Sequence, residues 1–277
     1  MSPSLMLNGR VPVWTSRQRD QQASVCRVVS GSELAPEAKD ARIIMEYLQQ
    51  VLEGNPYPGR GVLWARTGSG ALCGGYFLTG RSPASRSRVL LRRKGELTVA
   101  PTGPAEQDAL RYYSAAREGT DWLVFGNGEQ VATIAERLTD GALPTAALDQ
   151  LDYEPDPPIF TPRISVVVGL GGPGTAWFGA ARRSLSGRSA SNRLTVAVTE
   201  LEPGDCVLMT TYVSDGREIV TGAPFIEART AAGDRDEFVD EVWNALNPEL
   251  RVAAAAFEPG QIEAAVIRQV NSVADAG

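Results

Sequence analysis

Short apolar runs separated by brief turns dominate the middle of the chain. They occupy residues 62–66, 71–79, 89–92, 97–100, 122–125 and 164–168, with later runs at 194–199 and 206–212 and an alanine-rich one at 252–257. The first four follow one another so closely that no crossover helix fits between them. The pattern therefore predicts antiparallel sheet and not βαβ units.

Apolar residues at helical spacing predict helices around these strands. Ser32 and Pro36 mark the start of the first helix, and Gly54 marks its end. Further helices are expected at residues 105–117, 131–138, 143–151, 237–246 and 261–270. Helices toward both ends with strands between them predict an α+β fold, with two stacked antiparallel sheets inside and helices outside.

The start of the chain is less regular than the rest. A short strand is expected at residues 24–29. We predict that residues 1–40 form an N-terminal extension packed on a single domain made by residues 41–277.

A loop rich in arginine and serine interrupts the apolar runs after Gly80. Arg81, Arg86 and Arg88 lie within eight residues, and an apolar run resumes directly afterwards. Guanidinium groups this close repel one another unless anions lie between them, and arginine suits bidentate contact with phosphate or carboxylate. The functional interpretation is an anion pocket at the end of a hairpin, and the alternative is a solvated basic loop.

A glycine-rich segment at residues 169–174 fits the dinucleotide-binding spacing GxGxxG. That motif requires a helix to begin at its third glycine, whereas residues 175–179 have the character of a returning strand. Pro173 also stands where a phosphate-binding N–H would be needed. The segment is therefore predicted to be a β-hairpin turn.

Composition narrows the chemistry. The 277 residues carry a net charge of -6, which argues against a broad nucleic-acid surface. The chain has no histidine, which removes the commonest general base and most zinc sites, and its 3 cysteines lack CxxC spacing. We expect no metal, no cofactor and no disulfide frame. No signal pattern or membrane-spanning run is present, so a cytoplasmic location is expected.

Five motifs in one order carry a family resemblance. They are Asn55-Pro-Tyr-Pro-Gly-Arg-Gly61, the arginine loop at 80–88, Gly126-Asn127-Gly128 with Thr133-Ile134, the segment from Tyr153-Glu154 to Thr161-Pro162-Arg163-Ile164, and Thr211-Tyr212. Together they resemble the archaeal-type inosine monophosphate (IMP) cyclohydrolase family, from about residue 44 to 257. The resemblance implies a four-layer α/β/β/α sandwich similar to N-terminal-nucleophile hydrolases, without their self-processing.

The activity that the resemblance implies closes 5-formamidoimidazole-4-carboxamide ribotide to IMP with loss of water. Such a reaction is intramolecular, so alignment of the two groups supplies much of the acceleration. Arginine, tyrosine and carboxylate can supply the charge stabilisation and proton relay, without metal or cofactor. The implied partner is a small-molecule purine ribotide, with neither nucleic acid nor membrane, and homo-oligomerisation is left open.

The resemblance also implies site residues. Arg86 and Tyr113 match the active-site arginine and tyrosine of the family, the first to hold the formyl oxygen and the second to relay a proton. Tyr153 and Glu154 match its acidic-aromatic segment, with Glu154 expected to orient or deprotonate the carboxamide. Candidates for phosphate, base and ribose are Arg81, Arg88, Asn127, Thr161 and Arg163. The rival interpretations are a partly buried helix tyrosine at Tyr113, a turn former at Asn127, a solvated Glu154 and a structural ion pair at Arg163.

Three departures from the family pattern leave alternatives open. Val131 and Ala132 stand where polar residues are usual, and Ser114 stands where asparagine is usual. The alternatives are a catalytically silent ribotide-binding or scaffold protein, and a paralogue acting on a purine-like nucleotide in specialised nucleoside biosynthesis. A third hypothesis is an amide hydrolase with Ser2 as N-terminal nucleophile, against which Pro3 and the lack of an apolar strand at residue 2 argue.

Overall fold

A six-stranded sheet, sheet A, forms one half of the structure. The computed structural model describes residues 45–103, 110–172 and 174–272, all within one compact unit, Ile44–Gly277. The strand order is β13-β10-β1-β2-β14-β15, and every pair of neighbours is antiparallel. The strands are β1 (Arg60–Arg66), β2 (Leu72–Thr79), β10 (Asp205–Thr210), β13 (Phe225–Arg229), β14 (Arg251–Phe257) and β15 (Val266–Gln269).

A seven-stranded antiparallel sheet, sheet B, forms the other half, and its strands β3 to β9 follow the order of the chain. They are β3 (Arg88–Arg93), β4 (Glu96–Pro101), β5 (Tyr113–Glu118), β6 (Trp122–Gly126), β7 (Arg163–Gly169), β8 (Ala176–Arg183) and β9 (Ser191–Val198). A short pair, β11 (Tyr212–Val213) and β12 (Val220–Thr221), stands apart from both sheets. The prediction of an α+β fold with two antiparallel sheets is confirmed.

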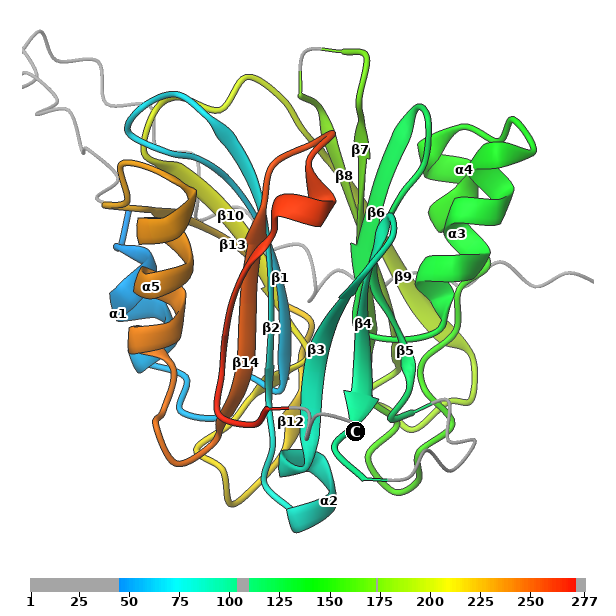
Figure 1. Ribbon diagram of the computed structural model, residues 1–277. Coiled ribbons are helices and arrows are strands. Elements are labelled where there is room, and N and C mark those ends of the chain that lie inside the picture. Colours follow the sequence, from blue (N-terminus) through cyan, green and yellow to red (C-terminus); the bar gives the residue numbers. More distant parts are fainter. Residues whose placement is uncertain (1–44, 104–109, 173, 273–277) are drawn as a thin grey trace, which may run out of the picture. The chain divides into compact units, whose positions relative to one another are not determined.

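Alternation along the strands divides the apolar side chains into three layers. Trp64 and Tyr76 of sheet A meet Phe125 and Phe178 of sheet B in the core between the sheets. The opposite face of sheet A packs against α1 (Leu48–Glu53) and α5 (Arg235–Ala245). The opposite face of sheet B packs against α3 (Gln130–Thr139) and α4 (Pro144–Leu148). Figure 1 shows these helices on the outer sides of the two sheets.

Several expected elements are present. Strands β1 and β2 form the predicted hairpin, and β7 and β8 pair antiparallel around the glycine-rich turn, so the dinucleotide motif is a hairpin as predicted. The helices expected at 131–138, 143–151 and 237–246 correspond to α3, α4 and α5. The expected strand at 24–29 and the start of the first helix lie outside the described residues. No described helix is long and apolar enough to cross a membrane.

The prediction of helices at 105–117 and 261–270 is wrong where the structure describes those residues. Tyr113–Glu118 is strand β5, which pairs with β4 and β6. Residues 262–264 form one 3₁₀ turn, and β15 then pairs with the free edge of β14. Both stretches contain alanine and polar residues that suit a helix, but an unpaired sheet edge provides the stronger partner.

The prediction that the arginine loop ends a hairpin is also wrong. Both edges of β2 are occupied, by β1 and β14, so β3 cannot pair with β2 and begins sheet B instead. The segment is a crossover between the sheets. It contains a single turn of helix, α2 (Pro83–Arg86), which the side chain of Ser82 caps by accepting from the Ser85 N–H.

Candidate active site

A cavity of about 420 Å³ opens where the ends of both sheets meet the crossover segment. Sheet A supplies Arg60 at the start of β1 and Thr79 at the end of β2, and Arg88 comes from the start of β3 in sheet B. The other lining residues are Tyr57, Gly59, Arg81, Ser82, Ala84, Ser85, Leu110, Arg111, Glu154, Asp156, Ile159, Tyr212 and Ile219. The cavity is therefore assembled from segments far apart in the sequence.

A buried ion pair lies in the wall of this cavity. Arg60 and Glu154 are only 8% and 3% exposed, and Nη2 of Arg60 lies 2.9 Å from Oε2 of Glu154. Burial raises the pKa of Glu154 above 4.5, and the neighbouring guanidinium opposes that rise. Burial alone would lower the pKa of Arg60, but the Glu154 carboxylate and nearby phenols, Tyr113 first among them, hold it above its usual value. Arg60 therefore stays charged, and Glu154 can exchange a proton closer to neutral pH.

Asn127 fixes the position of this carboxylate. Its amide nitrogen donates to Oε1 of Glu154 (3.1 Å) and to the Pro162 carbonyl (2.8 Å). Its amide oxygen accepts from the Ile164 N–H (2.7 Å) and from Nε2 of Gln130 (2.9 Å). These four contacts use the full hydrogen-bonding capacity of a buried asparagine. Asn127 thus acts on Glu154, and none of its groups is left for a ligand.

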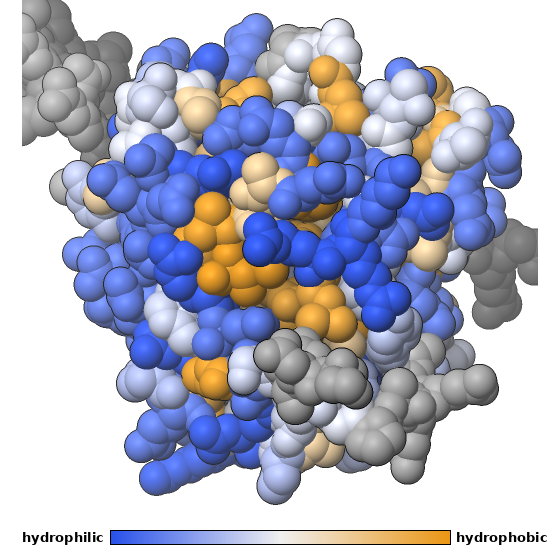
Figure 2. All heavy atoms as spheres, viewed as in Figure 1, coloured by the Kyte–Doolittle hydropathy of each residue, from blue (hydrophilic) through white to orange (hydrophobic). Residues whose placement is uncertain are grey.

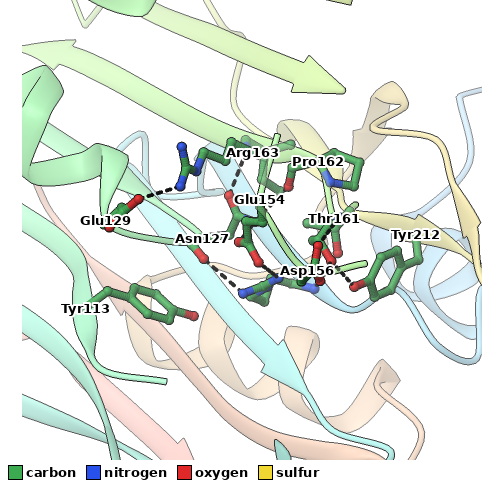
Figure 3. A network of polar contacts seen from close by, with 12 residues as sticks. Tyr113, Asn127, Glu129, Glu154, Asp156, Thr161, Pro162, Arg163 and Tyr212 are labelled. Atoms are coloured by element: carbon green, nitrogen blue, oxygen red, sulfur yellow. Dashed lines mark hydrogen bonds and ion pairs between the residues drawn. The ribbon is translucent and has the colours of Figure 1, made fainter. Parts of the chain in front are cut away.

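A chain of hydroxyl groups runs beside the ion pair (Figure 3). Oγ1 of Thr161 lies 2.6 Å from Oδ2 of Asp156 and 2.6 Å from the hydroxyl oxygen of Tyr212. Because an ionised carboxylate only accepts, Thr161 donates to Asp156 and accepts from Tyr212. The Tyr212 ring stacks on Tyr57 with centroids 5.7 Å apart, and burial raises the pKa of the Tyr212 hydroxyl.

Two tyrosines join the sheets at the inner side of the site. The hydroxyl oxygens of Tyr76 on β2 and Tyr113 on β5 are 2.7 Å apart, and both side chains are buried. Figure 3 shows Tyr113 beside the network of Asn127 and Glu154. Burial, followed by the proximity of Tyr113, raises the pKa of Tyr76. The raised pKa keeps the Tyr76 hydroxyl protonated at neutral pH, and the two hydroxyl groups share one hydrogen bond.

Arginines on the crossover side of the cavity have no carboxylate partner among the described residues. Arg81 donates to the carbonyls of residues 216 and 217, and Arg88 donates to those of Ser85 (2.7 Å) and Thr79 (3.2 Å). Arg111 has a buried Nε without a hydrogen-bond partner among the described residues. Their positive charge is therefore available to an anion in the cavity.

Residues 57–260 match the model of a family described as IMP cyclohydrolase-like protein. The chain belongs to this family. It is 30% identical over 183 residues to the IMP cyclohydrolase of Haloquadratum walsbyi (64% of this chain, 82% of the relative) and 35% identical over 152 residues to that of Halobacterium salinarum (53% and 69%). The match to the Natronomonas pharaonis IMP cyclohydrolase, 44% over 90 residues, spans 47% of that protein and 30% of this chain. The predicted family resemblance is confirmed.

In this IMP cyclohydrolase-like protein the predicted site residues separate into two groups. Arg81, Arg88 and Glu154 line the cavity, and Asn127 and Thr161 hydrogen-bond to the lining residues Glu154 and Asp156. Tyr113 does not line the cavity, and its hydroxyl contacts Tyr76, which does not line it either. The others lie elsewhere. Arg86 is exposed at the end of α2, the Tyr153 hydroxyl donates to the Ser189 carbonyl (2.8 Å), and Arg163 pairs with Glu129 (2.6 Å), none of them lining the cavity.

Sequence reasoning missed Arg60, Tyr76, Asp156 and Tyr212 as site residues. Arg60 and Tyr212 lie within motifs that carried the family resemblance, so position within those motifs was a usable signal. Tyr76 and Asp156 gave none, since a tyrosine in an apolar strand and an aspartate in a proline-rich connector are both commonplace.

The departures from the family pattern leave the cavity wall intact. Val131 is fully buried in the outer core under α3, with Ile134 and Leu138. Neither Ala132 nor Ser114 lines the cavity. Among the described residues no group of three or more potential ligands lies close enough to hold a metal ion.

Proposed function

We propose that this protein closes the pyrimidine ring of 5-formamidoimidazole-4-carboxamide ribotide, giving IMP and water. The observation that carries the proposal is the buried Arg60–Glu154 pair in the wall of a cavity whose other arginines have no carboxylate partner among the described residues, with the Tyr76–Tyr113 pair buried near Arg60. Membership of the IMP cyclohydrolase-like family supports it.

The reaction needs one proton acceptor and one proton donor on opposite sides of the new bond. The carboxamide nitrogen attacks the formyl carbon and loses a proton, while the formyl oxygen gains one, giving a carbinolamine. Loss of the proton of the formamide nitrogen together with the hydroxyl group then releases water and forms the C=N bond to that nitrogen. We assign the first proton to Glu154, whose raised pKa suits a general base. Tyr113 donates to the formyl oxygen, and Tyr76 supports it.

We assign the stabilisation of the developing charge and the binding of the phosphate to arginine side chains. Arg60 is charged and buried beside Glu154 and Tyr113. We therefore propose that its guanidinium stabilises the negative charge that develops on the formyl oxygen. The family resemblance gives that role to Arg86, and for this exposed residue we propose a contact at the mouth of the cavity. Arg81 and Arg88 hold the 5′-phosphate.

The wider assignments belong to the same proposal. We propose an N-terminal-nucleophile-hydrolase-like α/β/β/α sandwich that does not process itself, because helices pack on the outer face of each sheet. We also propose that residues 1–40 are an extension of a 41–277 domain and that the protein has a cytoplasmic role in purine biosynthesis. We propose a catalytic role for Tyr153 and binding roles for Thr161 and Arg163.

The direct test is the rise in ultraviolet absorbance that accompanies purine formation. Wild-type protein should convert the formamido ribotide, and Glu154→Gln should lose that conversion. Glu96→Gln is the matched control, because this glutamate pairs with Arg117 and neither residue lines the cavity. Folded wild-type protein that leaves the formamido ribotide unchanged would count against the proposal.

A ribotide-binding protein without activity is the rival interpretation. Its support in the sequence was the apolar pair Val131 and Ala132, and Val131 packs in the outer core, away from the cavity. Tight binding of IMP in calorimetry together with no turnover would favour this rival.

A further inference from the structure

The last described strand lies beyond the part of the chain that matches the family. The match ends at residue 260, whereas β15 spans Val266–Gln269 and forms an edge of sheet A. β15 also reaches across to sheet B, because Oε1 of Gln269 accepts from the Leu90 N–H of edge strand β3 (2.9 Å). Figure 1 shows this red stretch descending beside β14, and in Figure 2 hydrophobic side chains gather in the middle of the same face.

Asn271, just after β15, ties this C-terminal stretch to the crossover segment. Its amide nitrogen donates to the carbonyl oxygens of Arg86 (2.6 Å) and Arg88 (2.9 Å). The first of these belongs to the last residue of α2, and the final carbonyls of a helix lack partners within it. One side chain therefore uses both of its N–H donors to fix the backbone on either side of Ser87.

The backbone held in this way positions the arginines of the cavity. The crossover contributes Arg81, Ser82, Ala84, Ser85 and Arg88 to the cavity wall. The guanidinium of Arg88 is oriented by backbone oxygens, those of Ser85 (2.7 Å) and Thr79 (3.2 Å). A shift of α2 would move the Ser85 carbonyl and, with it, the charge presented to a ligand.

We propose that residues 266–271 form a latch that holds the crossover in its anion-binding geometry, with Asn271 as a positioning residue. The latch acts through Arg88 and α2 on the phosphate of a bound ribotide, and in naming that ligand it rests on the proposed function. It predicts an effect confined to ligands that carry a phosphate.

The test compares Asn271→Ala and Asn271→Asp with Gln261→Ala, which removes an exposed amide of the same C-terminal region that donates to Glu258 (3.4 Å). Aspartate keeps the shape of asparagine but cannot donate to carbonyls. Both Asn271 variants should bind IMP about tenfold more weakly than wild type, the size expected for two lost hydrogen bonds. Inosine, which lacks the phosphate, should bind all variants equally.

Hydrogen exchange supplies a second readout that needs no ligand. Backbone amides of residues 81–88 should exchange about tenfold faster in both Asn271 variants and at the wild-type rate in Gln261→Ala. Unchanged exchange, or equal loss of IMP and inosine binding, would overturn the latch. Wild-type protein that binds IMP without turning over the formamido ribotide would refute the cyclohydrolase activity. The IMP affinities and exchange rates of the Asn271 variants would still test the latch.

Discussion

Arg60 and Glu154 depend on each other for their charges, because both are almost completely buried. Burial raises the pKa of Glu154, and Arg60 works against that rise. A carboxyl whose pKa is raised on folding favours the folded state at low pH, and that contribution is lost as the pH rises through the folded pKa. The general-base role proposed for Glu154 has the opposite pH dependence, since the carboxylate that would accept a proton appears as the pH rises.

Replacement of Arg60 by methionine should therefore raise the pKa of Glu154 further. The acid limb of the pH–rate profile should move to higher pH. Stability at neutral pH should fall by about 3–5 kcal/mol, the usual effect of leaving a buried charge unpaired. Denaturant unfolding at pH values below and above the acid limb measures the free energy of unfolding. The pH dependence of kcat/KM measures the position of the acid limb. A variant with an unmoved acid limb would show that Glu154 is not the titrating base.

The role of the Tyr113 hydroxyl can be tested by comparing the turnover of Tyr113→Phe with that of Tyr112→Phe. Tyr113→Phe removes the hydroxyl that contacts Tyr76, and turnover should slow by roughly 10²–10⁴-fold, the range for a lost acid or base. Stability should fall by only about 1 kcal/mol. Tyr112→Phe is the control, because Tyr112 is 39% exposed, whereas Tyr113 is 4% exposed, and the Tyr112 ring contacts Arg93 and not the Tyr76 hydroxyl. Equal rates for both variants would remove Tyr113 from the reaction.

The crossover between the sheets depends on a glycine for its shape. A Cβ at Gly80 would lie 2.6 Å from the carbonyl carbon and oxygen of Ser85, and 2.9 Å from the Arg86 nitrogen. These are backbone atoms, so Gly80→Ala must displace α2 and should destabilise the fold by about 1–3 kcal/mol. Weaker IMP binding should accompany that loss. Gly171→Ala is the control, since a Cβ there meets nothing within 4 Å. Wild-type stability and binding in Gly80→Ala would contradict this view.

Most strands were predictable from the sequence because alternation and short turns are local signals. The two strands that were predicted as helices were missed for the same reason. Residues 113–118 and 266–269 carry no strong strand pattern, and they become strands because neighbouring edges were free to pair. The same limit applied at the site. The family resemblance pointed to Tyr113 and Glu154, whereas the burial of Arg60 is a property of packing that a single arginine before a strand does not reveal.

At the scale of the described unit, the site depends on how the two sheets pack. Arg60 and Tyr76 come from sheet A, and Tyr113 and Asn127 come from sheet B or the turn that follows β6. The core between the sheets sets the distances between these groups. Loosening that core should therefore impair the reaction even where no lining residue is changed.

A crystal of the wild-type protein soaked with IMP tests the central claim most directly. The account predicts the phosphate within hydrogen-bonding distance of Arg81 and Arg88, and the purine ring beside Glu154 and Tyr113. A second cavity, of about 570 Å³, lies between α3 and the β5–β6 turn, lined among others by Trp122 and Glu136. IMP bound there, with the cavity at Arg60 left empty, would contradict the account.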